Sequence, residues 1–183
     1  MEIIGLLAED IWNKQTIQSP KESNKVSFSQ LKNIEVTGCH NLINVFPSNM
    51  LPQLKNLERL CVEDCPSLTL LVEQVNPNNI QSSVLLYLKS ISISHCDSLR
   101  HVFSAFVARQ LACIEKLCVE ACSGMEVIVS DARGEGVTDD GIIEFSQLET
   151  LKLLNLPNLK SFFQSKFEAS HLFNYQVRIL QLF

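Results

Sequence analysis

Leucine and other apolar residues recur along this chain in one spacing that returns five times. The common pattern is L-x-x-L-x-L-x-x-C-x-x-L-x-x-φ, in which φ is an apolar residue. The five copies begin at Leu31, Leu57, Leu88, Ile114 and Leu148, so their spacings are 26, 31, 26 and 34 residues. Self-similarity at such a period is the sequence signature of a repeat architecture. Because short and long copies alternate, the pattern predicts a two-repeat unit with a longer loop in every second turn.

The L-x-L step predicts a β-strand in every copy. Successive side chains of a strand point to opposite faces, so Leu60 and Val62 face one side while Cys61 faces the other. One such strand cannot bury its apolar side alone, whereas stacked turns make a parallel sheet over a continuous core. We therefore predict an α/β leucine-rich-repeat solenoid with a parallel β-sheet on its concave face and about five recognisable repeats, whose apolar slots form the core.

The cysteine slot lies where the chain leaves the strand. A small apolar side chain with a weak S–H donor suits a buried turn that faces backbone groups. We therefore expect Cys39, Cys65, Cys96 and Cys122 to lie inside the protein. The chain has seven cysteines, an odd number, and the repeat explains their positions better than a disulfide framework does.

The segments between the strands are predicted to contain short helices and two long loops. Residues 104–111 read as a helix, and residues 47–54 as about one helical turn because they contain two prolines. Residues 73–83 and 130–141 interrupt the regular spacing of the repeats and are predicted to form loops. Residues 1–27 are interpreted as a partial preceding repeat and an inter-repeat loop, with Trp12 packing on the first full turn. Residues 28–165 would be the solenoid, and residues 166–183 the start of a further truncated repeat.

Composition and charge narrow the classes of partner. With 46% hydrophobic and 19% charged residues, the chain reads as globular. The net charge is −5 and no run of Lys and Arg exceeds two residues, which argues against nucleic acid and anionic membrane surfaces. No apolar run approaches the roughly 18 residues that a membrane span needs. The first ten residues lack the basic region of a secretory signal, and no Asn-x-Ser/Thr sequon occurs, which favours an intracellular protein.

The candidate chemistry has simpler structural interpretations. Cys61 and Cys65, like Cys118 and Cys122, are four residues apart, which along a strand is about 13 Å and too far for one zinc ion. The slot cysteines next to His40 and His95 are expected to be buried, and buried thiols are inert. No G-x-x-x-x-G-K-[ST] phosphate loop occurs, so we expect no ATP binding. We predict no catalytic, cofactor-binding or metal-binding residue, and no enzyme activity.

The remaining candidate site is the solvent-facing surface of the strands. Its residues alternate with the buried anchors of each repeat, and their mixed charge fits a protein partner better than a nucleic acid. They could also form an ordinary solvated face. The candidate partner-binding residues are Asn33, Glu35, Thr37, Arg59, Cys61, Glu63, Ser90, Ser92, Ser94, Lys116, Cys118, Glu120, Thr150, Lys152 and Leu154.

Several segments resemble a known family of plant proteins. Residues 28–34 read F-S-Q-L-K-N-I and residues 145–151 read F-S-Q-L-E-T-L, while residues 63–68 read E-D-C-P-S-L and residues 156–159 read L-P-N-L. Over roughly residues 10–165, these repeats resemble the C-terminal leucine-rich repeats of plant intracellular immune receptors of the coiled-coil, nucleotide-binding class.

The resemblance implies a cytoplasmic protein-recognition and regulatory module that acts in defence against pathogens. It would sense a pathogen effector or a host protein modified by one, and would restrain the receptor's own nucleotide-binding domain if that lies upstream. The phosphate loop of that domain is missing here, so the chain is expected to be a fragment of such a receptor or a truncated relative.

Two neighbouring families fit less well. Plant cell-surface receptors carry asparagine at the cysteine slot and a G-x-I-P turn, and this chain has neither. F-box adaptors use a cysteine there but continue into an I-T-D-x-G-L phrase, which residues 137–142 echo out of register. A leucine-rich-repeat scaffold or a ubiquitin-ligase substrate adaptor of the F-box type stays open as the alternative.

Overall fold

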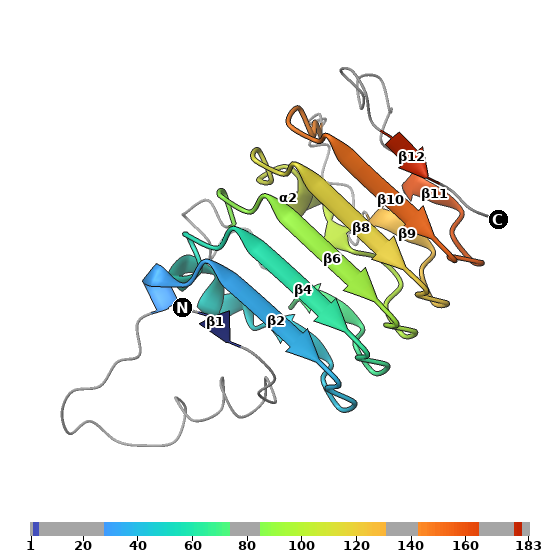
Figure 1. Cartoon of the computed structure of the whole chain (residues 1–183), viewed down its shortest axis with the longest axis horizontal. Coiled ribbons are helices and arrows are strands. Elements are labelled where there is room, and N and C mark those ends of the chain that lie inside the picture. Colours follow the sequence, from blue (N-terminus) through green and yellow to red (C-terminus); the bar gives the residue numbers. More distant parts are fainter. Residues whose placement is uncertain (1, 4–27, 74–84, 131–142, 165–177, 181–183) are drawn as a thin grey trace, which may run out of the picture.

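Seven parallel strands form the main sheet, in the order β1-β2-β4-β6-β8-β10-β12 (Figure 1). The computed structural model describes residues 2–3, 28–73, 85–130, 143–164 and 178–180. The strands of this sheet are β1 Glu2–Ile3, β2 Asn33–Thr37, β4 Arg59–Glu63, β6 Ser90–Ser94, β8 Lys116–Glu120, β10 Thr150–Leu154 and β12 Arg178–Leu180. Because spatial order follows sequence order, each repeat adds one strand beside the previous one, and the predicted leucine-rich-repeat solenoid is confirmed.

The five central strands pair without a shift in register. Leu60 of β4 lies beside Ile34 on one side and Ile91 on the other, and the same slot continues through Leu117 to Leu151. Equivalent repeat positions therefore form straight rows across the sheet. These rows arise because equivalent apolar positions of neighbouring repeats must lie side by side on the same face of the sheet to share one core.

A second layer of short parallel strands lies behind the main sheet, and it was not predicted. It contains a pair, β3 and β5, and a three-stranded sheet in the order β11-β9-β7. The bounds are β3 Asn44–Phe46, β5 Leu70–Val72, β7 Phe103–Ser104, β9 Val127–Ser130 and β11 Ser161–Phe163. The signal was present in the sequence, because the last slot of each repeat lies in or next to a run of β-branched, aromatic or aliphatic residues.

The helices are shorter than the sequence suggested. Residues 104–111 were expected to be helical, but α2 covers only Ala105–Ala108, with the Ser104 hydroxyl accepting the N–H of Val107 at its start. After Arg109, whose N–H bonds the carbonyl of Ala105, the next amides bond three residues back, which ends the α-helix. The other helices of the described residues are 3₁₀ turns, η1 Phe28–Gln30 and η2 Ser48–Gln53, and η2 confirms the short turn expected over residues 47–54.

Every anchor slot of the first four repeats is buried, as predicted. In the fifth repeat Leu148 and Leu151 are buried, whereas the four later slots are only partly buried against the core; these are Leu153, Leu156, Leu159 and Phe162. The fifth turn packs on the fourth turn on one side and, among the described residues, pairs only with β12 on the other. Most of residues 1–27 and 166–183, including Trp12, and nearly all of the two predicted loops lie outside the described residues, so the division of the chain into these parts stays a prediction.

Each repeat leaves its strand through a residue with a positive φ. The five residues are Gly38, Asp64, His95, Ala121 and Asn155, with φ between 50° and 68°. This left-handed conformation turns the chain sharply, so that the next residue, the slot cysteine or leucine, points back toward the core. Its amide also links neighbouring turns, because the N–H of each residue in the first four repeats donates to the last strand carbonyl of the following repeat.

Ala121 occupies this position at a cost that glycine would not incur, so Ala121→Gly is expected to stabilise the protein. A left-handed backbone conformation costs a residue with a Cβ about 1–2 kcal/mol, and glycine removes this cost. Glycine also has more conformational entropy in the unfolded chain, which offsets about 0.5–1 kcal/mol of the gain in stability. We expect a higher midpoint of chemical denaturation, with a net gain of about 0.5–1 kcal/mol. The control is Ala112→Gly, at an exposed position outside the positive-φ set, which is expected to lower the midpoint. If both variants lowered it equally, Ala121 would not be strained.

Candidate functional site

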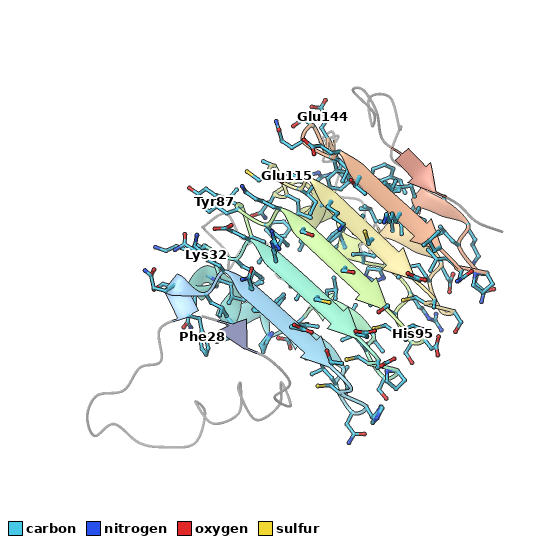
Figure 2. The ribbon with its side chains drawn as sticks, in the orientation of Figure 1. Phe28, Lys32, Tyr87, His95, Glu115 and Glu144 are labelled. Atoms are coloured by element: carbon cyan, nitrogen blue, oxygen red, sulfur yellow. The ribbon has the colours of Figure 1, made fainter. Side chains whose placement is uncertain are left out.

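The fifteen residues predicted to bind a partner lie in three straight rows across β2, β4, β6, β8 and β10. Figure 2 draws the side chains of these strands. The first row is Asn33, Arg59, Ser90, Lys116 and Thr150. The second row is Glu35, Cys61, Ser92, Cys118 and Lys152. The third row is Thr37, Glu63, Ser94, Glu120 and Leu154. We call this surface the open face.

No residue of the open face is buried, whereas the residues that alternate with them in the first four repeats are buried. In β6, for example, Ile91 and Ile93 are 0% and 1% exposed, while the three serines between and beside them are partly exposed. The predicted alternation of buried and exposed side chains along these strands is therefore confirmed. Binding of a partner on this face remains a proposal, taken up below.

A ladder of alternating charge runs along the edge of the sheet where the strands begin. Lys32 Nζ lies 2.7 Å from Glu58 Oε1, and Lys89 Nζ lies 3.6 Å from Glu115 Oε1. The hydrogen bond and charge of Lys32 hold the pKa of the partly exposed Glu58 carboxyl below its usual value. Sequence reasoning missed these residues, although aligning the second position of the first four repeats shows the alternation of Lys and Glu. Because these charges compensate one another, the ladder adds little net charge to the open face.

The charges of the open face itself are separated along the strand direction. Arg59 and Lys116 lie in the first row, whereas Glu63 and Glu120 lie in the third row on the same two strands. None of these four side chains makes an ion pair in the part of the chain that the structure describes. The face is therefore basic where β4 and β8 begin and acidic where they end.

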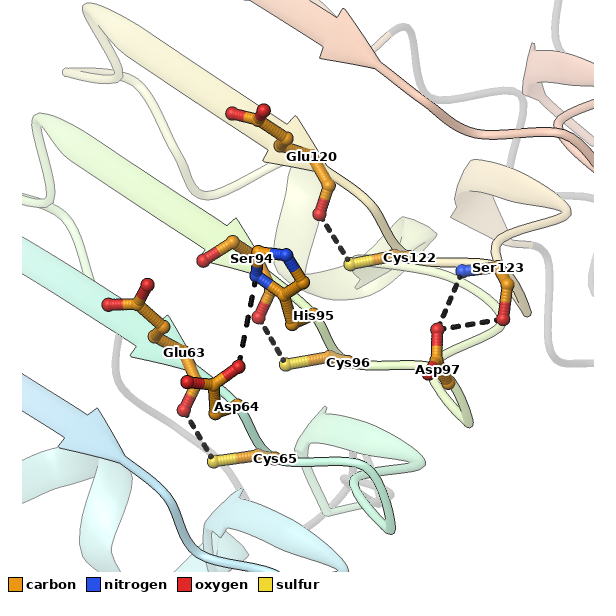
Figure 3. A network of polar contacts seen from close by, with 10 residues as sticks. All are labelled: Glu63, Asp64, Cys65, Ser94, His95, Cys96, Asp97, Glu120, Cys122 and Ser123. Atoms are coloured by element: carbon orange, nitrogen blue, oxygen red, sulfur yellow. Dashed lines mark hydrogen bonds and ion pairs between the residues drawn. The ribbon is translucent and has the colours of Figure 1, made fainter.

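The slot cysteines hold the turns at the ends of the strands (Figure 3). The thiols of Cys65, Cys96 and Cys122 each donate to the carbonyl two residues earlier at 3.3 Å, and Cys39 does so at 3.7 Å. That carbonyl belongs to the last strand residue, and in the second to fourth repeats it also accepts the amide of the preceding turn. All four cysteines are buried, which confirms the prediction of a structural slot.

Polar side chains continue the links between turns just beyond the cysteines. His95 Nδ1 lies 3.8 Å from Asp64 Oδ1, and both side chains are more than half exposed. Asp97 Oδ1 accepts the hydroxyl of Ser123 at 2.7 Å and its amide at 3.1 Å, which lowers the pKa of the Asp97 carboxyl (Figure 3). Asn158 then donates to the carbonyl of Ser123 at 2.8 Å. These groups are engaged with one another between repeats, which indicates a structural role.

Within the described ranges, no group of three or more His, Cys, Asp or Glu side chains is arranged to hold a metal ion. In the same ranges every buried polar side-chain atom has a hydrogen-bond partner. No helix of the described residues is long and apolar enough to cross a membrane. The side chains that the open face presents are charged, hydroxyl, amide and thiol groups and one leucine.

The cysteines differ in accessibility, and native-state alkylation should separate them. Cys61 and Cys118 are partly exposed on the open face, so we expect both to be labelled in the folded protein. The four slot cysteines are expected to react only on unfolding, because buried thiols are protected from reagent. Peptide mapping of the labelled chain measures both groups. Labelling of Cys39 or Cys65 as fast as that of Cys61 would contradict the burial of the slot.

Alkylation of Cys61 should also depend on its acidic neighbours. Partial burial raises the pKa of the Cys61 thiol, and the carboxylates of Glu35 and Glu63 raise it further. Since the thiolate is the reactive form, labelling of Cys61 should accelerate as the pH rises through 7 to 9. Glu35→Gln should accelerate it at fixed pH, while the rate at Cys118, two strands further from Glu35, serves as the internal control. An unchanged Cys61 rate in this variant would exclude the effect of the Glu35 carboxylate.

Comparison with known proteins places these repeats among plant disease resistance proteins. The family described as "Plant disease resistance protein RPS2-like, leucine-rich repeats" matches residues 4–84 and 72–179. Disease resistance protein SUMM2 of Arabidopsis thaliana is 29% identical over 118 residues, which are 62% of this chain and 13% of that protein. A second protein of the same plant, named as a probable disease resistance protein, is 30% identical over 117 residues, or 62% of this chain and 15% of its own length. No solved structure matches the chain significantly.

Proposed function

The chain belongs to the leucine-rich-repeat family of plant disease resistance proteins, and we propose that it is the protein-recognition and regulatory module of a plant immune receptor. Its relatives carry disease resistance in their names, and the chain spans about one seventh of their length. We propose that the module acts in the cytoplasm and has no catalytic activity of its own. Its proposed partners are a pathogen effector or a host protein modified by one, and the receptor's own nucleotide-binding domain where that lies upstream.

One observation supports recognition by the open face more than any other. Five strands present three rows of partly or fully exposed side chains in register, on a sheet whose opposite side is the core. The rows contain both charges, amide and hydroxyl groups and one leucine, a mixture that suits a protein surface. A repeat solenoid is built to present such an extended surface to a partner.

The F-box adaptor alternative is not taken further, because both relatives are named as disease resistance proteins and no observation favours an adaptor.

Proximity labelling in leaf cells challenged with a pathogen would test this proposal. The full 183-residue chain would be compared with an open-face variant, Asn33→Ala/Lys152→Ala, and with a control, Lys55→Ala/Arg100→Ala, whose exposed cations lie away from the open face. We expect proteins that are labelled by the wild type and the control but lost with the open-face variant, and that bind the purified wild-type chain directly. Partners lost only with the control variant, or unaffected by either change, would overturn the proposal.

A further inference from the structure

The middle strand of the sheet lies between two strands that present matching side chains. On the open face β4 presents Arg59, Cys61 and Glu63, and β8 presents Lys116, Cys118 and Glu120. Each thus carries a cation, a thiol and a carboxylate in the same order, and register places them row by row on either side of β6. The strand between them presents only serines, at positions 90, 92 and 94. The small serine side chains leave the space above β6 open between four longer charged ones.

We call Arg59, Lys116, Glu63 and Glu120 the four-charge frame, and its dimensions follow from sheet geometry. The two cations are two strand spacings apart, about 10 Å, and so are the two carboxylates. Cation and carboxylate on one strand are four residues apart, about 13 Å. Opposite charges within the frame are therefore too far apart to form ion pairs with one another.

The frame differs from the charged ladder at the edge of the sheet. There Lys32 and Glu58 are at 2.7 Å and neutralise each other, whereas no member of the frame has an ion-pair partner among the described residues. Arg59, Lys116 and Glu120 are exposed and Glu63 is partly exposed. The four charges are therefore available to a partner without breaking an internal contact.

We propose that the four-charge frame binds an extended protein segment that lies along β6, with an acidic side chain between Arg59 and Lys116 and a basic side chain between Glu63 and Glu120. An extended chain rises about 3.3 Å per residue, so the two charges of the segment lie four residues apart and on the same side of it. The residue halfway between them faces Ser92 and the two half-buried thiols, where a small or apolar side chain fits. This inference rests on the proposed function and specifies the chemistry of its partner.

A helix matches the frame less well than an extended segment does. Residues on one face of a helix recur near seven and eleven positions, and the residue whose rise comes nearest to the frame, eight positions along at about 12 Å, is turned by about 80° around the helix axis. An untilted helix therefore does not point both charges directly at the basic and acidic ends of the frame, which are roughly 13 Å apart. An extended segment places both charges correctly without tilting.

A second copy of the chain is the other occupant that charge alone would permit. Two open faces stacked with their strands antiparallel would place Arg59 opposite Glu63. Homodimer interfaces, however, bury an apolar core, and the only apolar side chains of this face are two cysteines and Leu154. The net charge of −5 also repels a second copy.

Selection from a displayed library of random twelve-residue peptides would test the proposal with the purified 183-residue chain. The wild type is expected to enrich peptides with an acidic and a basic residue four positions apart. Arg59→Glu/Lys116→Glu should bind these peptides with an affinity that is lower by about 10-fold or more. The same variant should itself select peptides without the acidic residue. Glu63→Lys/Glu120→Lys should select peptides without the basic residue. Circular dichroism and thermal midpoints establish that the variants are folded.

Two control variants separate failure of this inference from failure of the proposed function. Glu35→Lys/Lys152→Glu reverses charges on the open face outside the frame, and Lys55→Glu/Arg100→Glu reverses charges away from that face. Enriched peptides that depend on Glu35 and Lys152 but not on the frame would overturn the inference while keeping the open face as a binding surface. Peptides sensitive only to Lys55 and Arg100 would count against both. Enrichment without any charge pattern, or a dimer of the wild type that the frame variants dissociate, would also overturn the inference.

Discussion

Replacing Ile93 by alanine is expected to lower the free energy of unfolding by about 2–5 kcal/mol. Ile93 lies in β6, in the middle of the main sheet, and is 1% exposed. Its neighbours in register, Val62 and Val119, are both fully buried, so the alanine would leave a cavity bounded on both sides by packed turns. Little of that cavity can close, because the strands on either side are held by the ladder of backbone hydrogen bonds.

Chemical denaturation of the full chain measures this effect, and Ser92→Ala is the matched control in the same strand. Ser92 is partly exposed on the open face, so its replacement should change stability by no more than about 0.5 kcal/mol. Leu60→Ala, which opens a cavity in β4 at the core position paired with Ile91, should resemble Ile93→Ala. Equal midpoints for Ile93→Ala and Ser92→Ala would mean that the strand faces are assigned the wrong way round.

The same alternation explains why the main sheet could be predicted from the sequence. A slot such as Leu60 or Ile93 is apolar in every repeat, and only a stack of parallel strands buries all copies of it at once. Placing the fifteen open-face residues required no further information, because a side chain that alternates with a buried anchor must face the other way. The slot cysteines followed from the same reasoning, and their S–H donation to the last strand carbonyl supplies the physical reason for them.

Other features depend on contacts between turns, which one repeat taken alone does not reveal. The back strands, such as β9, pair through residues 26 to 34 positions apart, and short apolar runs do not indicate whether they are strand or helix. The early end of α2 reflects the need to place Leu111 and Ile114, which precede β8, in the core, and this tertiary packing overrides helix propensity. That Lys32 pairs with Glu58 while Arg59 has no ion pair can be predicted only when the register between neighbouring strands is known. The stacking of the turns defines that register.

The sequence was therefore enough to predict which residues form the candidate site, but not how their charges are arranged relative to one another. The sequence lists Arg59, Glu63, Lys116 and Glu120 without placing them, and the same residues could have formed ion pairs in another register. Pairing of β4, β6 and β8 without a shift places like charges on either side of each terminal serine of β6. That arrangement is the basis of the four-charge frame.

Replacing Gly124 by alanine is expected to destabilise the protein by about 1–3 kcal/mol, or more if the turns cannot separate. Gly124 lies two residues after Cys122 in the fourth turn, and a Cβ there would overlap the carbonyl oxygen of Asp97 in the third turn. It would also lie 3.2 Å from the carbonyl carbon of Asp97, so the obstacle is backbone and not the end of a flexible side chain. The Asp97 carboxylate binds the amide and hydroxyl of Ser123, so relieving the overlap would strain these hydrogen bonds as well.

Gly38→Ala is the matched control, since it adds the same methyl group without the overlap. Gly38 has a φ of +68°, and nothing lies within 4 Å of the position its Cβ would take. Its cost is therefore limited to left-handed backbone strain of about 1–2 kcal/mol, the strain that Ala121 already bears in the fourth turn. Losing the unfolded-state entropy of glycine offsets about 0.5–1 kcal/mol of this cost. Denaturation midpoints of both variants should fall, with Gly124→Ala falling further, and hydrogen exchange should show weaker protection at the amide of Ser123. A midpoint for Gly124→Ala at or above that of Gly38→Ala would mean that the third and fourth turns pack less closely than the structure places them.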